Sequence, residues 1–348
     1  MNIHVIAQKL NISKRTIRFY EEKELISPTK HENNQYRTFT DEDIWRLQTI
    51  ITLREIGFTI SDIKLILGEI DTNQHHSLKH YLEIQRYSLY RTLLEYRQQI
   101  STTDQMITLL QHQDTVPLNE IFNLAEGAKR LREARSEWVD RWNYDTYATK
   151  HDHIVESSNS PYPNYHTILN TILNMTKPSP LELGLDLGTG TGNLAGKFLS
   201  NGYPIIAVDQ SSEMLKQCKE KFPHLETMLG NLLAIPCQDH QFDYIVSSFA
   251  LHHLNIKQIH IALSEMKRVL KPKGRICFAD FIMESPFSAA DTESAEFEYT
   301  DPYTYINEAN HALVSMSTLQ SWFEENDFII KRHIFPNDIQ IVMAVSIR

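Results

Sequence analysis

The chain has 348 residues, about twice the usual size of one domain, so we expect more than one hydrophobic core. Its 41% hydrophobic and 22% charged residues, with 11 Gly and 13 Pro, exclude collagen-like, low-complexity and largely disordered chains. No apolar run reaches the roughly 18 residues of a membrane span, and the N-terminus lacks a signal-peptide pattern, which predicts a soluble cytoplasmic protein without a membrane partner. Cys218, Cys237 and Cys277 stand at no metal-ligand spacing, so we expect reduced thiols and no metal site.

Charge is distributed unevenly along the chain. The formal net charge of −10, taken as a whole, argues against nucleic-acid binding. Residues 1–40, however, carry seven Lys or Arg against four Asp or Glu, and the whole acidic excess lies in residues 114–348. This asymmetry predicts two parts with different partners.

The first forty residues follow a helical pattern. An apolar stripe opens the chain, formed by Ile3, Ile6, Ala7 and Leu10. Ser13 suits the N-cap of a second helix through Glu22, with Ile17 and Phe19 facing inward. The outer face of this second helix is basic and consists of Lys14, Arg15 and Arg18. A short helix, a turn and a basic second helix predict a helix-turn-helix that enters a major groove, and a solvated basic face is the alternative.

The segments SKRTIRFYEEKELISP and NNQYRTFTDEDIWRLQTIITLREIGFTISDIKLIL resemble the MerR family of transcriptional regulators. The resemblance implies a winged helix-turn-helix that binds double-stranded promoter DNA at an operator. The DNA contacts that it implies are Lys14, Arg15 and Arg18 near the groove and its phosphates, Tyr20 on the backbone, and Tyr36 and Arg37 in the wing. Arg pairs bidentately with guanine or phosphate, whereas a Tyr hydroxyl on phosphate positions without specifying. The chain departs from the family pattern at Glu24 and Gln35, where Gly is usual, and at Phe19, where Tyr is common.

A long helical stretch follows, from Leu82 to about His112. Its apolar positions alternate mostly in steps of four and three, at Leu82, Leu89, Leu93, Tyr96, Ile100, Thr103, Ile107 and Leu110. This heptad seam, free of Gly and Pro, predicts a coiled coil, and one amphipathic helix packed on its own domain is the alternative. The MerR resemblance implies an antiparallel dimerisation helix, hence a homodimer through residues 82–110 that reads a pseudo-palindromic operator. MerR metal sensors place cysteines around this helix, and this chain has none before Cys218.

The next two segments lead into the second part of the chain. Residues 113–137 are polar and helix-prone, with Pro117 as a breaker, and predict a connector. Residues 138–155 bring two Trp and two Tyr into a short span. We expect a helix packed on the next core there, and a lid over a neighbouring site is the alternative.

A glycine loop follows the first apolar strand of the second part. The strand covers residues 183–187 and runs into Gly188-Thr189-Gly190-Thr191-Gly192, with a helix beginning near Asn193. Glycines let a ligand approach the backbone closely, and the helix N-terminus offers free N–H groups. The next strand, residues 205–208, ends in Asp209, whose carboxylate suits the two hydroxyls of a ribose. These features indicate a nucleoside-containing ligand without choosing among such cofactors.

Further strands are predicted over residues 227–229, 243–248 and 275–279, with a helix over residues 256–270 that ends in a Lys-Pro-Lys-Gly turn. Residues 328–334 and 339–346, separated by Pro336-Asn337-Asp338, predict a β-hairpin. Five strands alternating with helices and a closing hairpin predict a seven-stranded sheet whose last strand is antiparallel.

The segments LGLDLGTGTGNLA, AVDQSSEML, FDYIVSSFALHHL and VLKPKGRICFADF resemble, in this order and spacing, a class I S-adenosylmethionine-dependent methyltransferase. The fold class expected is therefore multidomain: an all-α winged helix-turn-helix with a long dimerisation helix, then a Rossmann-like α/β methyltransferase with a seven-stranded mixed sheet. The resemblance implies S-adenosylmethionine as cofactor. It places Asp186, Gly188, Gly190 and Gly192 along the methionine, Asp209 on the ribose, Met214 at the adenine face, Asn231 and Leu232 at its edge, and Phe249 near the sulfonium. The family usually has Asp where this chain has Asn231.

The position of His252 and His253, after the fourth strand, suits a base for an acceptor that must lose a proton. We predict a catalytic role for His253, and a structural role of the pair is the alternative. Residues 282–316 interleave aromatic and acidic side chains, which predicts either an acceptor-binding insertion for a planar, cationic or amine-bearing molecule or a solvated acidic surface.

The predicted division is residues 1–76 for the winged helix-turn-helix, 77–113 for the dimerisation helix, 114–137 for the connector and 138–348 for the methyltransferase domain. The function expected is a MerR-type regulator whose methyltransferase domain methylates a small-molecule acceptor. The alternative is a domain that only senses S-adenosylmethionine or another ligand without turnover. A methyltransferase acting on DNA is disfavoured, because the second part is acidic and lacks an Asn-Pro-Pro-aromatic tetrapeptide.

Overall fold

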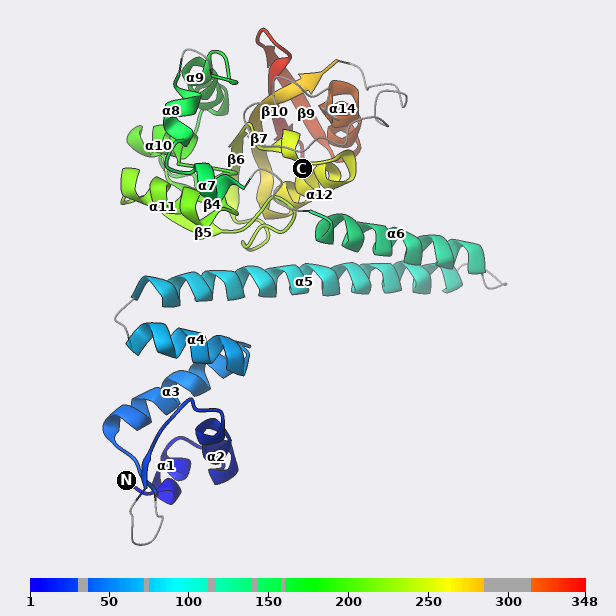
Figure 1. The fold of residues 1–348 in the computed structure, drawn as a ribbon. Helices are drawn as coiled ribbons and strands as arrows, with labels where there is room; N and C mark the ends of the chain where they lie inside the picture. The colour runs from blue at the N-terminus through cyan, green and yellow to red at the C-terminus, as the bar shows by residue number, and fades with distance from the viewer. Residues whose placement is uncertain (31–36, 72–74, 112–116, 139–142, 158–159, 285–313) are drawn as a thin grey trace. The chain divides into compact units, whose positions relative to one another are not determined.

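The computed structural model describes residues 1–30, 37–71, 75–111, 117–138, 143–157, 160–284 and 314–348 (Figure 1). It divides into two compact units, Met1–Arg86 and Tyr87–Arg348, which we term the head and the body. None of the helices within the described ranges is long and apolar enough to cross a membrane.

The head is built from short helices and a two-stranded antiparallel ribbon. Three of its helices begin at side-chain N-caps, and the third has a capping box between Thr40 and Asp43. The second begins after Ser13, as predicted, because the Ser13 hydroxyl accepts from the Thr16 amide at 3.0 Å. The elements are α1 (Ile3–Lys9), α2 (Lys14–Glu22), β1 (Thr29–Lys30), β2 (Arg37–Thr38), α3 (Asp41–Glu55), α4 (Ile60–Asp71) and the first part of α5 (His75–Gln111).

Helix α2 packs on the head core through Ile17 and Tyr20. Ile17 is fully buried, as predicted, but Phe19 is 39% exposed, so its predicted inward position was wrong. Tyr20 takes the inward place, because residues three apart lie on one helical face and residues two apart do not. The phenol of Tyr20 therefore belongs to the core of the head.

Glu24 adopts a left-handed backbone conformation, with φ of +59°, directly after the C-cap of α2. This is the conformation that glycine adopts most easily, and Gly is the residue that the MerR pattern usually has at this position. The Glu24 carboxylate accepts from Lys64 Nζ on α4 at 2.5 Å, so the side chain holds the helix end against α4. Gln35, the second departure from the pattern, lies outside the described residues.

Helix α5 begins earlier than predicted and runs without interruption from His75 to Gln111. Seven members of the predicted seam are large and apolar, and each is between 38% and 61% exposed in the single chain: Leu82, Leu89, Leu93, Tyr96, Ile100, Ile107 and Leu110. The eighth, Thr103, is also exposed. The alternative, in which this face packs on the helix's own domain, is therefore not what the structure shows for these side chains.

The segment predicted as a connector forms α6 (Leu118–Ser136), which begins after Pro117. Its last turn packs into the core of the body, where Ala134 is 3% exposed. The Ala134 carbonyl accepts from Gln258 Nε2 at 3.1 Å, which ties α6 to α12 (Ile256–Val269). The end of α6 is therefore part of the body's core.

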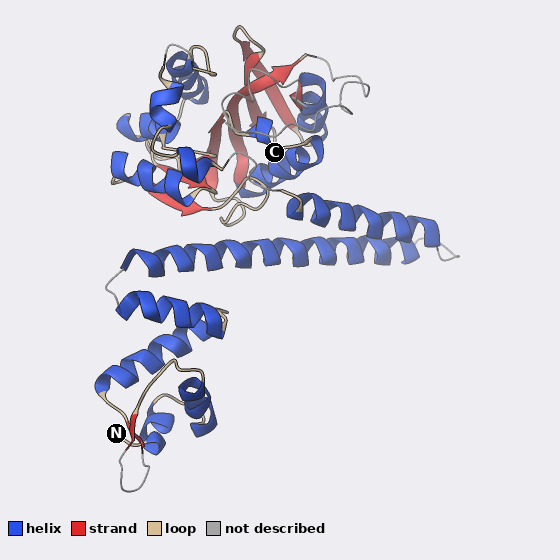
Figure 2. Ribbon diagram, in the orientation of Figure 1, coloured by secondary structure: helices blue, strands red, loops and turns tan. Residues whose placement is uncertain are grey.

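The body contains a mixed sheet with helices on both faces (Figure 2). Its main strands follow the order β5-β4-β3-β6-β7-β10-β9, in which β10 is antiparallel to both neighbours, as predicted. Alternate residues of each strand point to opposite faces, one covered by α9, α10 and α11 and the other by α6, α12 and α14. The strands are β3 (Gly184–Leu187), β4 (Ile205–Asp209), β5 (Glu226–Leu229), β6 (Phe242–Ser248), β7 (Leu270–Met283), β9 (Phe328–Ile334) and β10 (Ile339–Ser346).

Two features of the sheet differ from the prediction. The Lys-Pro-Lys-Gly segment lies within β7 and not before it, because Leu270 already pairs with Phe242 of β6. Within this segment Lys273 has φ of +62°, and the pairing of β7 with β6 shifts in register between Phe242 and Tyr244. A short extra strand, β8 (Val314–Ser315), pairs with the end of β7. The other helices of the body are α7 (Tyr144–Tyr147), α8 (His151–Val155), α9 (Tyr165–Thr176), α10 (Asn193–Ser200), α11 (Ser212–Lys221) and α14 (Met316–Glu325), with the 3-10 helix η1 (Leu251–His253).

Candidate functional site

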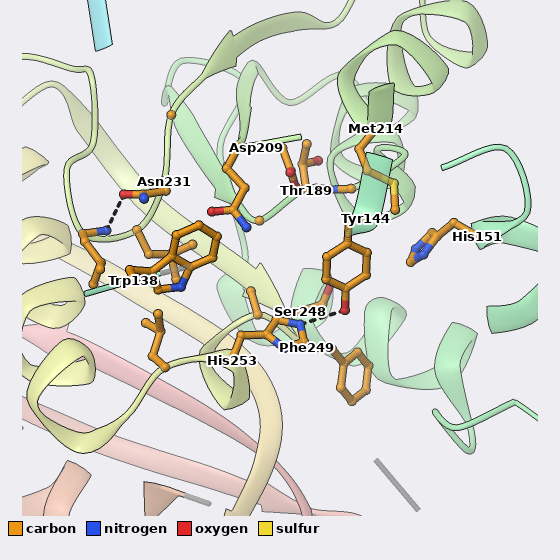
Figure 3. Close-up of a pocket in the computed structure, with 18 of the residues that line it drawn as sticks. Trp138, Tyr144, His151, Thr189, Asp209, Met214, Asn231, Ser248, Phe249 and His253 are labelled. Carbon is orange, nitrogen blue, oxygen red and sulfur yellow. Dashed lines mark hydrogen bonds between the residues drawn. The ribbon is translucent and has the colours of Figure 1, made fainter. Parts of the chain in front are cut away.

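A pocket lies at the carboxyl ends of β3, β4 and β6 (Figure 3). The sheet order reverses between β3 and β6, and ligands of open α/β sheets bind at such a switch point. The pocket brings together eight of the predicted site residues: Gly188, Gly190, Asp209, Met214, Asn231, Leu232, Phe249 and His253. Asp186 and Gly192 lie behind the loop and do not line the pocket.

The three loop glycines have left-handed backbones, but they serve different purposes. A Cβ at Gly188 would lie 2.6 Å from Ala250 Cβ, and one at Gly192 would lie 2.5 Å from Cys218 Sγ, so these two glycines let the loop pack on its neighbours. A Cβ at Gly190 would meet nothing closer than His151 Nε2 at 3.6 Å. Gly190 is therefore the point at which the backbone is open to a ligand.

Two carboxylates hold the glycine loop in place. Asp209 at the end of β4 accepts from the Gly190 amide at 2.8 Å and from the Ser211 amide at 2.9 Å. Asp186 is fully buried, and its Oδ2 accepts from Thr189 Oγ1 at 2.6 Å and from the Ala195 amide at 3.1 Å. Its Oδ1 is buried without a hydrogen-bond partner, and burial raises the pKa of Asp186 to about 7.

Asn231 turns its carbonyl oxygen into its own loop. Oδ1 accepts from the Leu233 amide at 3.0 Å and from the Ala234 amide at 3.2 Å. These two bonds orient the side-chain amide, so its NH₂ group is the part left for a ligand. Met214, at 2% exposure, and Leu232 add apolar surface to the same pocket.

Phe249 lies at the centre of an aromatic wall. It is 7% exposed and has φ of +54°, which is an uncommon backbone conformation for a bulky residue. Its ring centroid lies 4.3 Å from that of Tyr162, 5.7 Å from that of Phe281 and 6.0 Å from that of Tyr165. The wall gives the pocket an apolar side.

The two histidines after β6 have different surroundings. His253 lines the pocket, and its Nε2 lies 2.9 Å from the hydroxyl oxygen of Tyr144. His252 is buried, and its Nδ1 lies 2.7 Å from Oδ1 of Asp280, a carboxylate that also accepts from the Leu251 amide at 2.7 Å. His252 therefore belongs to the buried turn, and His253 is the histidine that faces a ligand.

The pocket is covered by the aromatic segment of residues 138–155, of which the structure describes Trp138 and residues 143–155 and which we term the lid. Trp138, Tyr144 and His151 line it, which is the position expected of a lid. Asp145 fastens this segment to the start of α11, because its Oδ1 accepts from Ser211 Oγ at 2.5 Å. None of these lid residues was predicted as a site residue, although the cluster of aromatic side chains in residues 138–155 indicated this segment. Residues 285–313, most of the predicted acceptor-binding insertion, lie outside the described residues.

On the head, the predicted DNA contacts fall into three groups. Lys14, Arg15 and Arg18 are all exposed on α2. Arg37 is partly buried, and its Nε donates to Glu21 Oε2 at 2.5 Å, so it is held against α2. Tyr20 lies in the core of the head, as described above, and Tyr36 lies outside the described residues.

Comparisons with known proteins agree with both parts. Residues 1–70 match the family model of the MerR helix-turn-helix regulatory proteins, and residues 185–278 match that of a methyltransferase domain. An uncharacterized methyltransferase of Alkaliphilus oremlandii is 35% identical over 146 residues, which are 41% of this chain and 67% of the relative. One of Anoxybacillus flavithermus is 31% identical over 161 residues, which are 46% of this chain and 73% of the relative.

Solved structures are similar at lower identity. The YcgJ protein from Bacillus subtilis has 18% identity, a TM-score of 0.41, and coverage of 52% of this chain and 98% of its own. A Haemonchus contortus phosphoethanolamine N-methyltransferase, solved with phosphomonomethylethanolamine and S-adenosylhomocysteine, has 16% identity, a TM-score of 0.46 and coverage of 61% of each chain.

The body has a Rossmann-like fold with a pocket at its switch point, its residues 185–278 match a methyltransferase domain, and a helix-turn-helix head precedes it. The chain belongs to the methyltransferases, and residues 1–70 of its head match the MerR helix-turn-helix family model.

Proposed function

We propose that this protein is a DNA-binding transcriptional regulator whose body binds S-adenosylmethionine and transfers its methyl group to a small-molecule acceptor. The observation that carries the proposal is the pocket at the switch point of the sheet, where Gly190 is open to a ligand and Asp209 stands beside it. The acidic body and the locally basic N-terminus suit the same division, because only the latter favours a polyanion.

The residues of the pocket fit this cofactor from end to end. A loop without side-chain obstruction at Gly190 suits the amino-acid part, and the carboxylate of Asp209 suits a ribose. Asn231 and Leu232 suit the adenine edge, with Met214 on its face. The Asn231 carbonyl already accepts from its own loop, so we expect Asn231 to donate to adenine through its NH₂ group. An Asp at this position, which the family pattern usually has, would lack that donor.

S-adenosylmethionine, held by these residues, would supply a methyl group activated by its sulfonium, with S-adenosylhomocysteine as the leaving group. The chain's part is to hold the acceptor in line, to exclude water and to take up a proton where the acceptor carries one. The aromatic wall around Phe249 serves the second task. The Tyr144–His253 pair takes up the proton. An acceptor with an N–H or O–H group passes its proton to the Tyr144 oxygen, while the phenolic proton moves to Nε2 of His253.

For the head, we propose that Lys14, Arg15 and Arg18 contact the major groove and its phosphates. All three are exposed on one helix that a side-chain cap starts at Ser13. The placement of Tyr20 in the head core and of Arg37 against Glu21 favours a structural contribution from these two residues. They would shape the helix and the wing that the three cations depend on.

The exposed apolar seam of α5 supports a homodimer, with residues 82–110 as its interface. Seven large apolar side chains on one helix are more than a solvated face ordinarily carries. We keep the division proposed from the sequence, with a winged helix-turn-helix at residues 1–76, a dimerisation helix at 77–113, a linking segment at 114–137 and a methyltransferase domain at 138–348. The last turn of the linking segment also packs into the core of the body, through Ala134.

Turnover is tested by following S-adenosylhomocysteine. Small molecules that copurify with the protein are identified by mass spectrometry and offered as acceptors together with S-adenosylmethionine. We expect S-adenosylhomocysteine and a methylated product from the wild type and a loss of both in His253→Ala. Binding of S-adenosylmethionine without product from any acceptor would favour the sensor alternative. Absence of binding would contradict the proposed function altogether.

A further inference from the structure

Helix α8 is fastened to the glycine loop by one carboxylate. Oδ1 of Asp152 accepts from Thr191 Oγ1 at 2.5 Å and from Asn193 Nδ2 at 2.9 Å. Its Oδ2 accepts from Lys221 Nζ of α11 at 2.5 Å. Burial alone would raise the pKa of Asp152, but the bonds from Lys221, Thr191 and Asn193 lower it, so the carboxylate stays charged. The position of α8 on the loop is therefore set by four side chains from three helices and the loop.

This attachment places the neighbouring residue, His151, inside the pocket. His151 lines the pocket, and its Nε2 lies 3.6 Å from the place that a Cβ on Gly190 would occupy. In Figure 3, His151 stands at the opposite side of the pocket from Asn231 and Trp138. Asn231 marks the proposed adenine end, so His151 stands at the end of the glycine loop, where an amino-acid part would lie.

Most donors of the glycine loop are already engaged within the protein. The Gly188 and Thr189 amides donate to the Val208 carbonyl at 2.9 and 3.1 Å. The Gly190 amide donates to Asp209, and the hydroxyls of Thr189 and Thr191 donate to Asp186 and Asp152. The surroundings are thus rich in carboxylates. They suit the ammonium group of an amino acid, and a donor from outside the loop would serve its carboxylate.

The imidazole of His151 has the chemistry for this task. Burial lowers the pKa of His151 to about 4, so the ring is neutral at physiological pH and carries one N–H donor and one acceptor nitrogen. A neutral donor at this place binds a carboxylate without adding a buried positive charge.

We propose that His151 is a binding residue for the carboxylate at the amino-acid end of the cofactor, and that Asp152 is the residue that positions it. The inference rests on the proposed function, because it names a further contact in the same pocket. It also gives the lid a role in recognition besides covering the site.

Two ligands distinguish a contact of His151 with the amino-acid end from binding of the nucleoside part. S-adenosylhomocysteine carries the amino-acid end, whereas 5′-methylthioadenosine has the same nucleoside and sulfur without it. We would titrate both by calorimetry into the full chain and its variants. In His151→Ala the affinity for S-adenosylhomocysteine should fall by about 10-fold or more, as expected for a hydrogen bond to a charged group. The affinity for 5′-methylthioadenosine should stay within about 2-fold.

Three further variants sharpen the test. His151→Gln keeps an N–H donor and should recover part of the lost affinity. His153→Ala removes an exposed imidazole from the same helix and should leave both affinities unchanged. Asp152→Asn, made in the wild-type background, should lower the affinity for S-adenosylhomocysteine relative to that for 5′-methylthioadenosine. The same substitution in the His151→Ala background should leave this ratio unchanged, because Asp152 acts through His151.

The outcomes are distinguishable from a failure of the proposed function. If the wild type binds neither ligand, the proposed function fails. If the wild type binds both and His151→Ala binds S-adenosylhomocysteine like the wild type, His151 does not contact the amino-acid end. Equal weakening of both ligands would also overturn the inference, because it would mean that His151 merely packs the glycine loop.

Discussion

The hydroxyl oxygen of Tyr144 lies 2.9 Å from Nε2 of His253, and this contact joins the lid to the turn after β6. The two residues are 109 positions apart in the chain, and their rings meet edge to face with centroids 5.4 Å apart. The pair faces the pocket next to the aromatic wall (Figure 3). In the mechanism that we propose, the same contact would both hold the lid over the pocket and connect the two groups that take up the proton.

The first prediction concerns this pair. Tyr144→Phe removes the hydroxyl and keeps the ring, so kcat for an acceptor with an N–H or O–H group should fall by about 10²-fold, the usual contribution of a general acid or base. The affinity for S-adenosylmethionine, measured by calorimetry, should stay within about 2-fold. A drop in cofactor affinity that matches the drop in kcat would mean that the hydroxyl only holds the lid.

The second prediction concerns DNA binding. Arg18→Ala should weaken binding to a promoter fragment that the wild type retains, and it should reduce the slope of log affinity against log salt by about 1. Fluorescence anisotropy at several salt concentrations measures both. Lys79→Ala, which removes a cation from α5 of the same head, is the control and should have little effect. Cofactor binding should be unaffected in both variants, and an equal loss of cofactor and DNA binding would contradict the division into two modules.

The third prediction concerns the seam of α5. Leu93→Glu combined with Ile100→Glu places two charges on the proposed interface, and the two side chains are 42% and 61% exposed in the single chain. Light scattering should give the mass of one chain, while circular dichroism shows the wild-type helix content. Thr92→Glu with Gln99→Glu adds the same charges beside the seam and should leave the dimer intact. A monomeric wild type, or a dimeric seam variant, would rule out this interface.

The fourth prediction concerns the pH dependence of stability. The folded-state pKa of Asp186 is raised from 3.8 to about 7, so between these values the folded chain binds a proton that the unfolded chain releases. The free energy of unfolding should therefore fall as the pH rises from about 4 to 7, by up to about 4 kcal/mol from this group. Asp186→Asn should lack this fall, as measured by urea unfolding at several pH values. Parallel pH profiles for variant and wild type would contradict the raised pKa.

Much of the fold was predictable because its signals are local. The hairpin bounds match the predicted runs of residues 328–334 and 339–346, since a Pro-Asn-Asp turn separates two apolar strands. The start of α2 was predictable from the N-cap Ser13 for the same reason. Phe19 was misplaced because an aromatic residue reads as core by composition, whereas helical geometry gives that place to Tyr20.

Long-range relationships in the site were not predictable in the same way. The glycine loop and Asp209 lie within one strand–helix–strand unit, and their arrangement follows from the topology. The partners Tyr144 and His151 come from the lid, whose position depends on single contacts such as Asp145 with Ser211 and Asp152 with Thr191. No periodicity encodes such contacts. The same holds for Ala134, which the polar composition of its segment assigned to a connector although it packs into the core.

Calorimetric titration of residues 1–348 with S-adenosylmethionine shows directly whether the pocket binds this cofactor. We expect saturable binding at one site per chain. We also expect the affinity of Asp209→Ala for S-adenosylmethionine to be lower by at least about 10-fold, because this variant lacks the carboxylate that we propose binds the ribose and that accepts from the Gly190 amide. A wild type that gives no heat of binding, or an Asp209→Ala variant that binds as tightly as the wild type, would contradict this proposal.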